Sequence, residues 1–114
     1  MRIVHSGEIA AQPVQEEGAK GATIRWLISR PEGAPNFAMR LFELQPGGST
    51  SQHEHAWEHE VFVLQGAGEV WSEKGTVLVS AGDAVLVMPD ERHQFRNTSQ
   101  SVTRFLCMVP LPYP

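Results

Sequence analysis

Cysteine is nearly absent from this sequence, whose 114 residues contain only Cys107. A single thiol cannot form an internal disulfide, so the chain suits a reducing compartment and we expect a cytoplasmic protein. Long hydrophobic runs are missing too. The apolar stretch at 84–88 is far shorter than the roughly 20 residues that a membrane-spanning helix needs. We therefore expect no membrane partner.

Positive charge is also scarce. Nine Lys and Arg against thirteen Asp and Glu give a net charge of −4, which leaves no basic surface for nucleic acid. The chain has neither the nucleophile elbow of a serine hydrolase nor a glycine-rich phosphate loop with a helix behind it. These absences leave a small molecule as the expected partner of the protein.

Turn-forming residues, by contrast, are plentiful. Ten Gly and eight Pro divide the chain into short segments rich in Val, Ile, Thr, Phe and Trp, which suit half-buried strands. No segment keeps an apolar period of 3.6 residues, so we predict an all-β single domain over 1–114. The strands are predicted at 23–28, 37–44, 51–55, 60–64, 68–72, 76–79, 84–88, 93–96 and 102–109, with at most a helical turn near 12–17.

Two of the predicted strands are apolar on both faces. The segment 84–88 is apolar throughout. In 102–109 apolar side chains fall on both sides, which are Phe105, Cys107 and Val109 on one and Val102, Leu106 and Met108 on the other. A strand with two buried faces in so small a protein needs a second layer of sheet or a partner subunit. We expect a homodimer.

Four of the five histidines fall into two groups. His53 and His55 are two residues apart, so on an extended strand both imidazoles project from one face. His59 follows after a short reversal, and His93 heads a later strand. Imidazole is a common ligand of transition metals, and four rings buried without a cation would leave polar nitrogens unsatisfied. We predict that these four bind one divalent metal and that the solitary His5 is exposed.

The same histidines belong to two ordered motifs. The first motif places in order Gly47, His53, His55, His59 and Gly66, and the second places Gly82, Pro89, His93 and Asn97. Over most of 35–110 these motifs resemble those of the cupins, and especially the small single-domain, four-histidine manganese cupins. The resemblance implies a cupin-type jelly-roll β-barrel with its core at about 35–110 and N-terminal strands in 1–34. It also implies a metal inside the barrel, Mn first and Fe second, with Zn, Ni or Cu as further alternatives.

His59 stands where the cupin motif has an acidic residue, and the neighbouring Glu60 is the competing ligand. Strand alternation separates the two, because an inward His59 shares its face with Val61 and Val63 while Glu60 then faces outward. The interval to Gly66 also fits position 59. We therefore predict His59 as the ligand.

Three functions are compatible with a four-histidine site. Four neutral ligands leave the divalent charge uncompensated, which favours an anionic further ligand such as hydroxide, a carboxylate or an enolate. We expect first a metal-dependent, dioxygenase-like oxidoreductase that uses oxygen or peroxide on a small molecule. The alternatives are a metal-dependent isomerase or lyase acting through an enolate, and a non-catalytic module that binds a small ligand.

Two further residues are candidates for catalysis. Arg40 interrupts an apolar strand, where its guanidinium could orient an anionic substrate or pair with a surface carboxylate. Cys107 lies on a strand face that the resemblance turns toward the metal cavity, and the alternative is an inert buried thiol. Trp57 either packs over a turn or lines the mouth of the pocket. Asn97 is expected to stabilise a turn.

Overall fold

The computed structural model describes residues 1–111, which form an all-β single domain as predicted. The strands are β1 Gln12–Pro13, β2 Lys20–Ile28, β3 Phe37–Ser49, β4 His59–Gln65, β5 Ala67–Ser72, β6 Gly75–Ser80, β7 Ala84–Val87, β8 His93–Arg96 and β9 Thr103–Pro110. Two short 3-10 helices, η1 Ser6–Glu8 and η2 Arg30–Glu32, complete the secondary structure of these residues. No helix in this part of the chain has the length and apolar character needed to cross a membrane.

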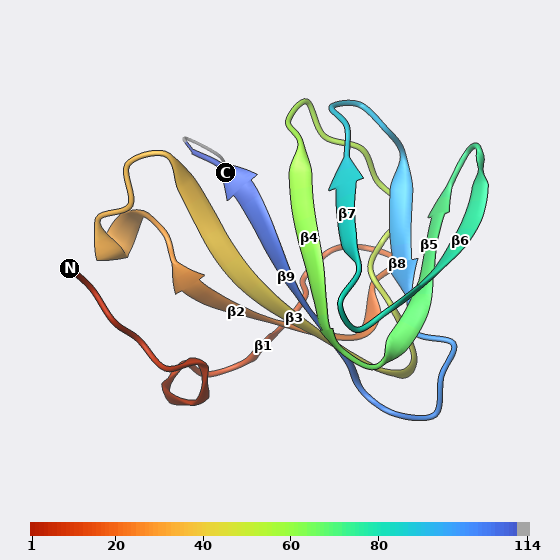
Figure 1. Ribbon diagram of the computed structural model, residues 1–114, viewed down its shortest axis with the longest axis horizontal. Coiled ribbons are helices and arrows are strands. Elements are labelled where there is room, and N and C mark those ends of the chain that lie inside the picture. Colours follow the sequence, from red (N-terminus) through yellow and green to blue (C-terminus); the bar gives the residue numbers. More distant parts are fainter. Residues whose placement is uncertain (112–114) are drawn as a thin grey trace.

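The strands form one curled antiparallel sheet in the order β6-β5-β8-β3-β9-β4-β7, with β2 added to β3 and β1 to β2. By this pairing, β9, β4 and β7 form one group beyond β3 and β8, β5 and β6 form another, and Figure 1 shows the strands converging near one end of the molecule. The long β3 joins the groups, because it pairs with β9 along most of its length and reaches β8 through Ser49. Gly47, at φ 78°, provides the left-handed backbone needed to bend β3 before that contact.

The core lies inside the curl because apolar residues alternate along the strands. In β4 and β9 every second side chain is buried, the pattern of strands with one face toward a core. Phe105 stacks between Phe42 and Phe95, with ring centroids 5.2 and 4.9 Å apart. Phe95 in turn contacts the ring of His93 at 6.0 Å. The aromatic stack therefore extends the core up to the ring of His93.

Two local predictions were wrong. Residues 51–55 are not a strand and make only an isolated bridge from His53 to His93. Backbone pairing with β8 is interrupted here: it occurs at Thr50 and at His53, and next to the segment the Thr50 hydroxyl accepts from the Phe95 N–H while the Gln94 amide donates to the Thr50 carbonyl. The expected helical turn near 12–17 is instead the short strand β1, since Gln12 and Pro13 pair with the edge of β2.

Candidate metal centre

Four imidazole rings meet inside the curl. The ring centroids of His53 and His55 are 4.3 Å apart, and those of His55 and His59 are 5.0 Å apart. His93 lies 5.3 Å from His59 and 4.7 Å from His53, so the four rings form a closed cycle. The diagonal between His55 and His93 is 6.1 Å. The structure thus brings together the four histidines that the sequence singled out. His5 lies apart on the surface, where its ring accepts a hydrogen bond from the Gly7 amide.

Backbone pairing explains how distant segments deliver these rings. His53 and His93 exchange two backbone hydrogen bonds of 3.1 and 2.9 Å, which fixes the loop at 51–58 against β8. His59 begins β4 opposite Val87 of β7. Strand alternation buries His59 to 5% exposure and leaves Glu60 exposed. The orientation inferred from alternation is confirmed, and the role of His59 as a ligand stays a prediction.

An acidic residue of the N-terminal segment holds the first of the rings. The Nδ1 atom of His53 lies 2.6 Å from Oε2 of Glu16, and the hydroxyl of Ser51 donates to the same carboxylate oxygen at 2.7 Å. A ring N–H that faces a carboxylate carries its proton on Nδ1, which leaves Nε2 with a free lone pair. Glu16 therefore selects the tautomer of His53 that can bind a metal.

The two buried rings, those of His59 and His93, also have a polar contact at Nδ1. Nδ1 of His93 lies 2.8 Å from the carbonyl oxygen of Glu91, and Nδ1 of His59 lies 3.3 Å from Sγ of Cys107. On the other side of the His59 ring, Nε2 is buried without a hydrogen-bond partner. A buried polar atom in this state is costly. A cation at Nε2 would remove that cost.

The surroundings of His55, His59 and His93 favour their neutral form. Burial lowers the pKa of His55 to about 4 and that of His59 to about 3, and it lowers the pKa of His93 as well. The hydrogen bond from His53 lowers the pKa of the Glu16 carboxyl to about 2. At neutral pH His55, His59 and His93 are therefore uncharged, which is the form that a metal requires of imidazole.

The donor set fits a divalent transition metal in its chemistry, because four imidazoles suit such ions and His59 presents an unsatisfied buried nitrogen. Within residues 1–111, no three or more His, Cys, Asp or Glu side chains form a group that could hold an ion as they stand. Neighbouring ring centroids in the cycle nevertheless lie only 4.3 to 5.3 Å apart, within one small region inside the curl.

A cavity of about 300 Å³ opens beside the cluster and is lined by His55 and His59. The N-terminal segment 12–16 covers one side of it, and Ile24, Trp26 and Phe42 line another. Trp57 also lines it and stacks on His55, with centroids 4.4 Å apart and planes 13° apart. Of the two alternatives left open for Trp57, the structure supports the one at the pocket.

Arg40 faces the interior and lines the same cavity. Its guanidinium lies 5.3 Å from the ring of Trp26 and 5.1 Å from that of Phe42, within reach of cation–π attraction. The ion pairs found among residues 1–111 do not include Arg40. The alternative of a surface ion pair is therefore not what the structure shows.

Cys107 lies behind the site and does not line the cavity. It is 3% exposed, and burial raises the pKa of its thiol. Nη2 of Arg40 donates to Sγ at 3.0 Å, so the sulfur connects that guanidinium to the His59 ring.

Asn97 is confirmed as a turn residue, since its side chain donates to the carbonyl of Ser101 and accepts from the amide of Ser99.

Sequence reasoning missed Glu16 and Trp26. Glu16 is 37 positions from His53, and no local pattern links an acidic residue in an irregular segment to a distant histidine. Trp26 carried a weak signal, because it lies in a predicted strand and shares the parity of Ile24. That parity placed both side chains on one face but could not say that the face lines a cavity.

Comparison with known proteins agrees with this architecture. The cupin domain family matches residues 40–109. The polyketide cyclase RemF from Streptomyces resistomycificus superposes with a TM-score of 0.94 at 39% identity, covering 100% of this chain and 82% of that one. An oxalate-binding protein from Thermotoga maritima is 31% identical over 114 residues, 96% of this chain and 93% of that protein.

A third relative matches a smaller part of this chain. The 1-methylthio-D-xylulose 5-phosphate methylsulfurylase from Rhodospirillum rubrum is 34% identical over 71 residues, which are 62% of this chain and 46% of that protein. The chain thus spans about half the length of this relative. The family match extends over more than half of the chain and coincides with the curled sheet that carries the histidines. This protein belongs to the cupin domain family.

Proposed function

We propose that this protein is a metal-dependent enzyme that converts a small aromatic ketone or polyketone through an enolate, as a cyclase or isomerase would. The observation that carries the proposal is the cavity of about 300 Å³, in which His55 and His59 face the same space as Trp26 and Phe42. Its similarity to RemF along the whole chain, at 39% identity, supports this class of substrate. We therefore place the enolate chemistry before the oxidoreductase that we expected first from the sequence.

The ligands of the metal would be His53, His55, His59 and His93. We propose Mn first and Fe second. Bound there, a divalent ion would supply Lewis acidity that polarises a substrate oxygen. Glu16, Cys107 and the carbonyl of Glu91 lie at the Nδ1 atoms of three of the rings, and by accepting a hydrogen bond there they would leave Nε2 free for the metal.

The walls of the cavity would bind and orient the substrate. Trp57 and Trp26 offer flat apolar surfaces to an aromatic ring. The guanidinium of Arg40, held between Trp26, Phe42 and Cys107, is a fixed positive charge at the same cavity. A fixed cation of this kind stabilises negative charge as it develops on an enolate oxygen, and it needs no rearrangement to do so.

Metal content tests the ligand set. The protein is purified without added metal, and bound metal is measured for the wild type, His59→Ala and Glu60→Ala. We expect sharply less metal in His59→Ala and little change in Glu60→Ala, because His59 faces the cluster and Glu60 faces outward. Equal loss in both variants, or loss only in Glu60→Ala, would contradict the ligand set.

Hydrogen–deuterium exchange tests the enolate. An ortho-hydroxyaryl methyl ketone, whose two oxygens can chelate, is incubated in D₂O under nitrogen, and loss of the methyl proton signal is followed by NMR. We expect faster exchange with the metal-loaded wild type than with His59→Ala, whether the metal is Mn or Zn. Turnover that requires oxygen would instead support the oxidoreductase, and tight binding without exchange would support a non-catalytic module.

A further inference from the structure

The N-terminal segment forms one wall of the cavity beside the histidines. Every residue of 12–16 lines this cavity, and Trp57 and His55 line other parts of it. We call residues 12–17 the strap. A substrate that fills the cavity therefore contacts the strap as well as the histidines.

The strap is weakly held to the rest of the fold. Of its side chains only that of Val14 is half-buried, and the others are exposed. Its backbone pairs with β2 at Gln12 and Pro13, and the Val14 amide then donates to the carbonyl of Ala22 at 3.0 Å. Segments with few buried apolar contacts and few backbone hydrogen bonds open at a low free energy. The strap therefore belongs to the parts of this fold that open easily.

Fixed points flank the strap on both sides. Before it, Nη1 of Arg25 donates to the carbonyl oxygens of Ser6 and Ile9 at 3.2 and 2.8 Å. After it, Gly18 and Gly21 have φ angles of 90° and 56°, in the left-handed region that glycine adopts at no steric cost. Two such glycines directly after the strap are places where the backbone can change direction. The strap can therefore move while the chain on either side stays in place.

One polar contact fastens the strap to the histidine cluster. Oε2 of Glu16 lies 2.6 Å from Nδ1 of His53 and accepts from the hydroxyl of the buried Ser51 at 2.7 Å. The side chain of Glu16 is itself half-exposed. An imidazole whose Nε2 binds a metal is fixed in its tautomer and orientation, and its Nδ1–H donates more strongly to a carboxylate. The contact that closes the strap is therefore one that a metal would strengthen.

We propose that occupancy of the four histidines by a metal controls the strap, so that the substrate cavity is complete only in the metal-loaded protein. Without a metal, Glu16 and His53 exchange their hydrogen bond for water at little cost, and the strap opens. With a metal, the stronger bond holds the strap closed. Such coupling is reciprocal, so closure of the strap must strengthen metal binding by the same factor. The inference rests on the proposed ligand set and does not depend on the enolate chemistry.

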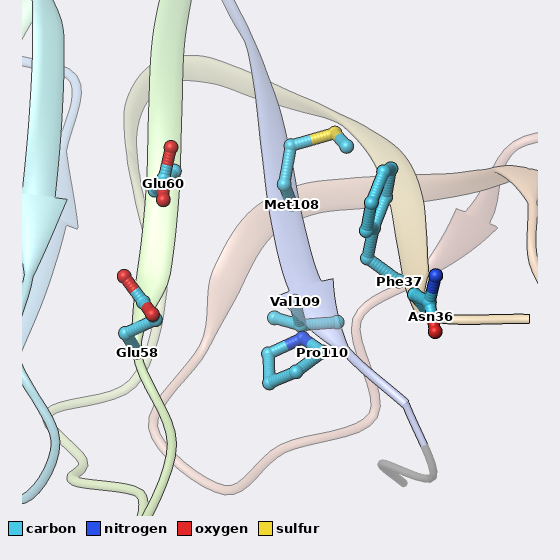
Figure 2. A pocket seen from close by; sticks show the side chains of 7 residues that line it. All are labelled: Asn36, Phe37, Glu58, Glu60, Met108, Val109 and Pro110. Atoms are coloured by element: carbon cyan, nitrogen blue, oxygen red, sulfur yellow. The ribbon is translucent and has the colours of Figure 1, made fainter.

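A second concavity provides a control for this proposal. Figure 2 shows it beside the start of β4 and the end of β9, with Glu58 and Glu60 on one side and Met108 and Phe37 on the other. Its volume is about 250 Å³, and within residues 1–111 its lining includes no residue of the strap. Glu60 follows His59 in the chain but is exposed and faces outward. It is therefore a carboxylate near the cluster that should have no influence on the strap.

Hydrogen–deuterium exchange of the full chain, measured by mass spectrometry, tests the coupling. The chelator-treated protein is compared with the same protein at saturating Mn²⁺, and bound Mn²⁺ is measured in each sample. We expect Mn²⁺ to slow exchange in the strap at least about 10-fold, because the Val14 amide bonds to Ala22 only when the strap is closed. The turn at η2, where the Gly33 amide bonds to the carbonyl of Arg30, should exchange at the same rate in both samples.

Two variants separate the strap from the histidines. Glu16→Gln, saturated with Mn²⁺, should lose the slowing of exchange, and Glu60→Gln should keep it. Gly18→Ala leaves every histidine contact chemically unchanged, but alanine is strained at a φ of 90° and should favour the open strap. By reciprocity the affinity of Gly18→Ala for Mn²⁺, measured by calorimetry, should fall about 5-fold or more.

The outcomes distinguish this inference from the ligand set on which it rests. Mn²⁺ that binds without slowing exchange in the strap would overturn the coupling and leave the ligand set standing. Slowing that persists in Glu16→Gln would overturn the role of Glu16, and wild-type Mn²⁺ affinity in Gly18→Ala would overturn the reciprocity. A wild-type protein that binds no Mn²⁺ would overturn both the coupling and the choice of this metal.

Discussion

Acid should destabilise the metal-free protein through its buried histidines. His59 is 5% exposed, and burial lowers its pKa from 6.5 to about 3. Because the folded state binds this proton less readily than the unfolded chain, His59 contributes stability that is fully present above pH 6.5. That contribution is lost as the pH falls from 6.5 toward 3.

The magnitude follows from the size of the shift. At pH 5 the solution is 1.5 pH units below the ordinary value of 6.5, and each unit corresponds to about 1.4 kcal/mol, so His59 alone should cost about 2 kcal/mol between pH 7 and pH 5. His55 and His93 shift in the same direction and add to the loss. Glu16, whose pKa is about 2, stays ionised across this range.

Urea unfolding of the chelator-treated protein at pH 7 and pH 5, followed by tryptophan fluorescence, measures this loss. In His59→Gln the drop in the free energy of unfolding between the two pH values should be about 2 kcal/mol smaller than in the wild type. His5→Gln is the control, because His5 is exposed and outside the cluster, and it should show the wild-type drop. An equal drop in His59→Gln and the wild type would refute the reasoning.

Two other predictions concern the support of the site and of the sheet. Glu16→Gln should reduce metal affinity, measured by calorimetry, about 10–100-fold, because a neutral amide orients the His53 ring less firmly. Glu17→Gln is the control, because Glu17 is exposed, and it should keep the wild-type affinity. Equal affinity in the two variants would show that Glu16 does not orient His53 for metal binding. Gly68→Ala should destabilise the fold by about 1–3 kcal/mol in urea, because its Cβ would lie 2.5 Å from the carbonyl oxygen of Arg96. A normal urea midpoint for Gly68→Ala would show that the strands can separate there at little cost.

The local sequence pattern was sufficient to predict the features of this protein that follow from strand alternation and turns. Alternation in β4 and β9 predicted which side chains are buried, including His59 rather than Glu60. Those features depend only on the period of two in extended backbone and on the conformations that Gly and Pro favour, so they can be read from neighbouring residues. The spacing of His53, His55 and His59 placed three of the rings near one another for the same reason, whereas His93 joined them through the resemblance to the cupin motifs.

Contacts between distant segments were decided only by the tertiary structure. The loop at 51–55 is not a strand because its backbone meets β8 only at the His53–His93 bridge, while side chains of Thr50 and Gln94 make hydrogen bonds beside it. Glu16 reaches His53 because β1 carries the N-terminal segment across the opening of the curl. Such pairings depend on how the sheet curls in three dimensions, and the periodicity of residues along the chain does not predict that curl.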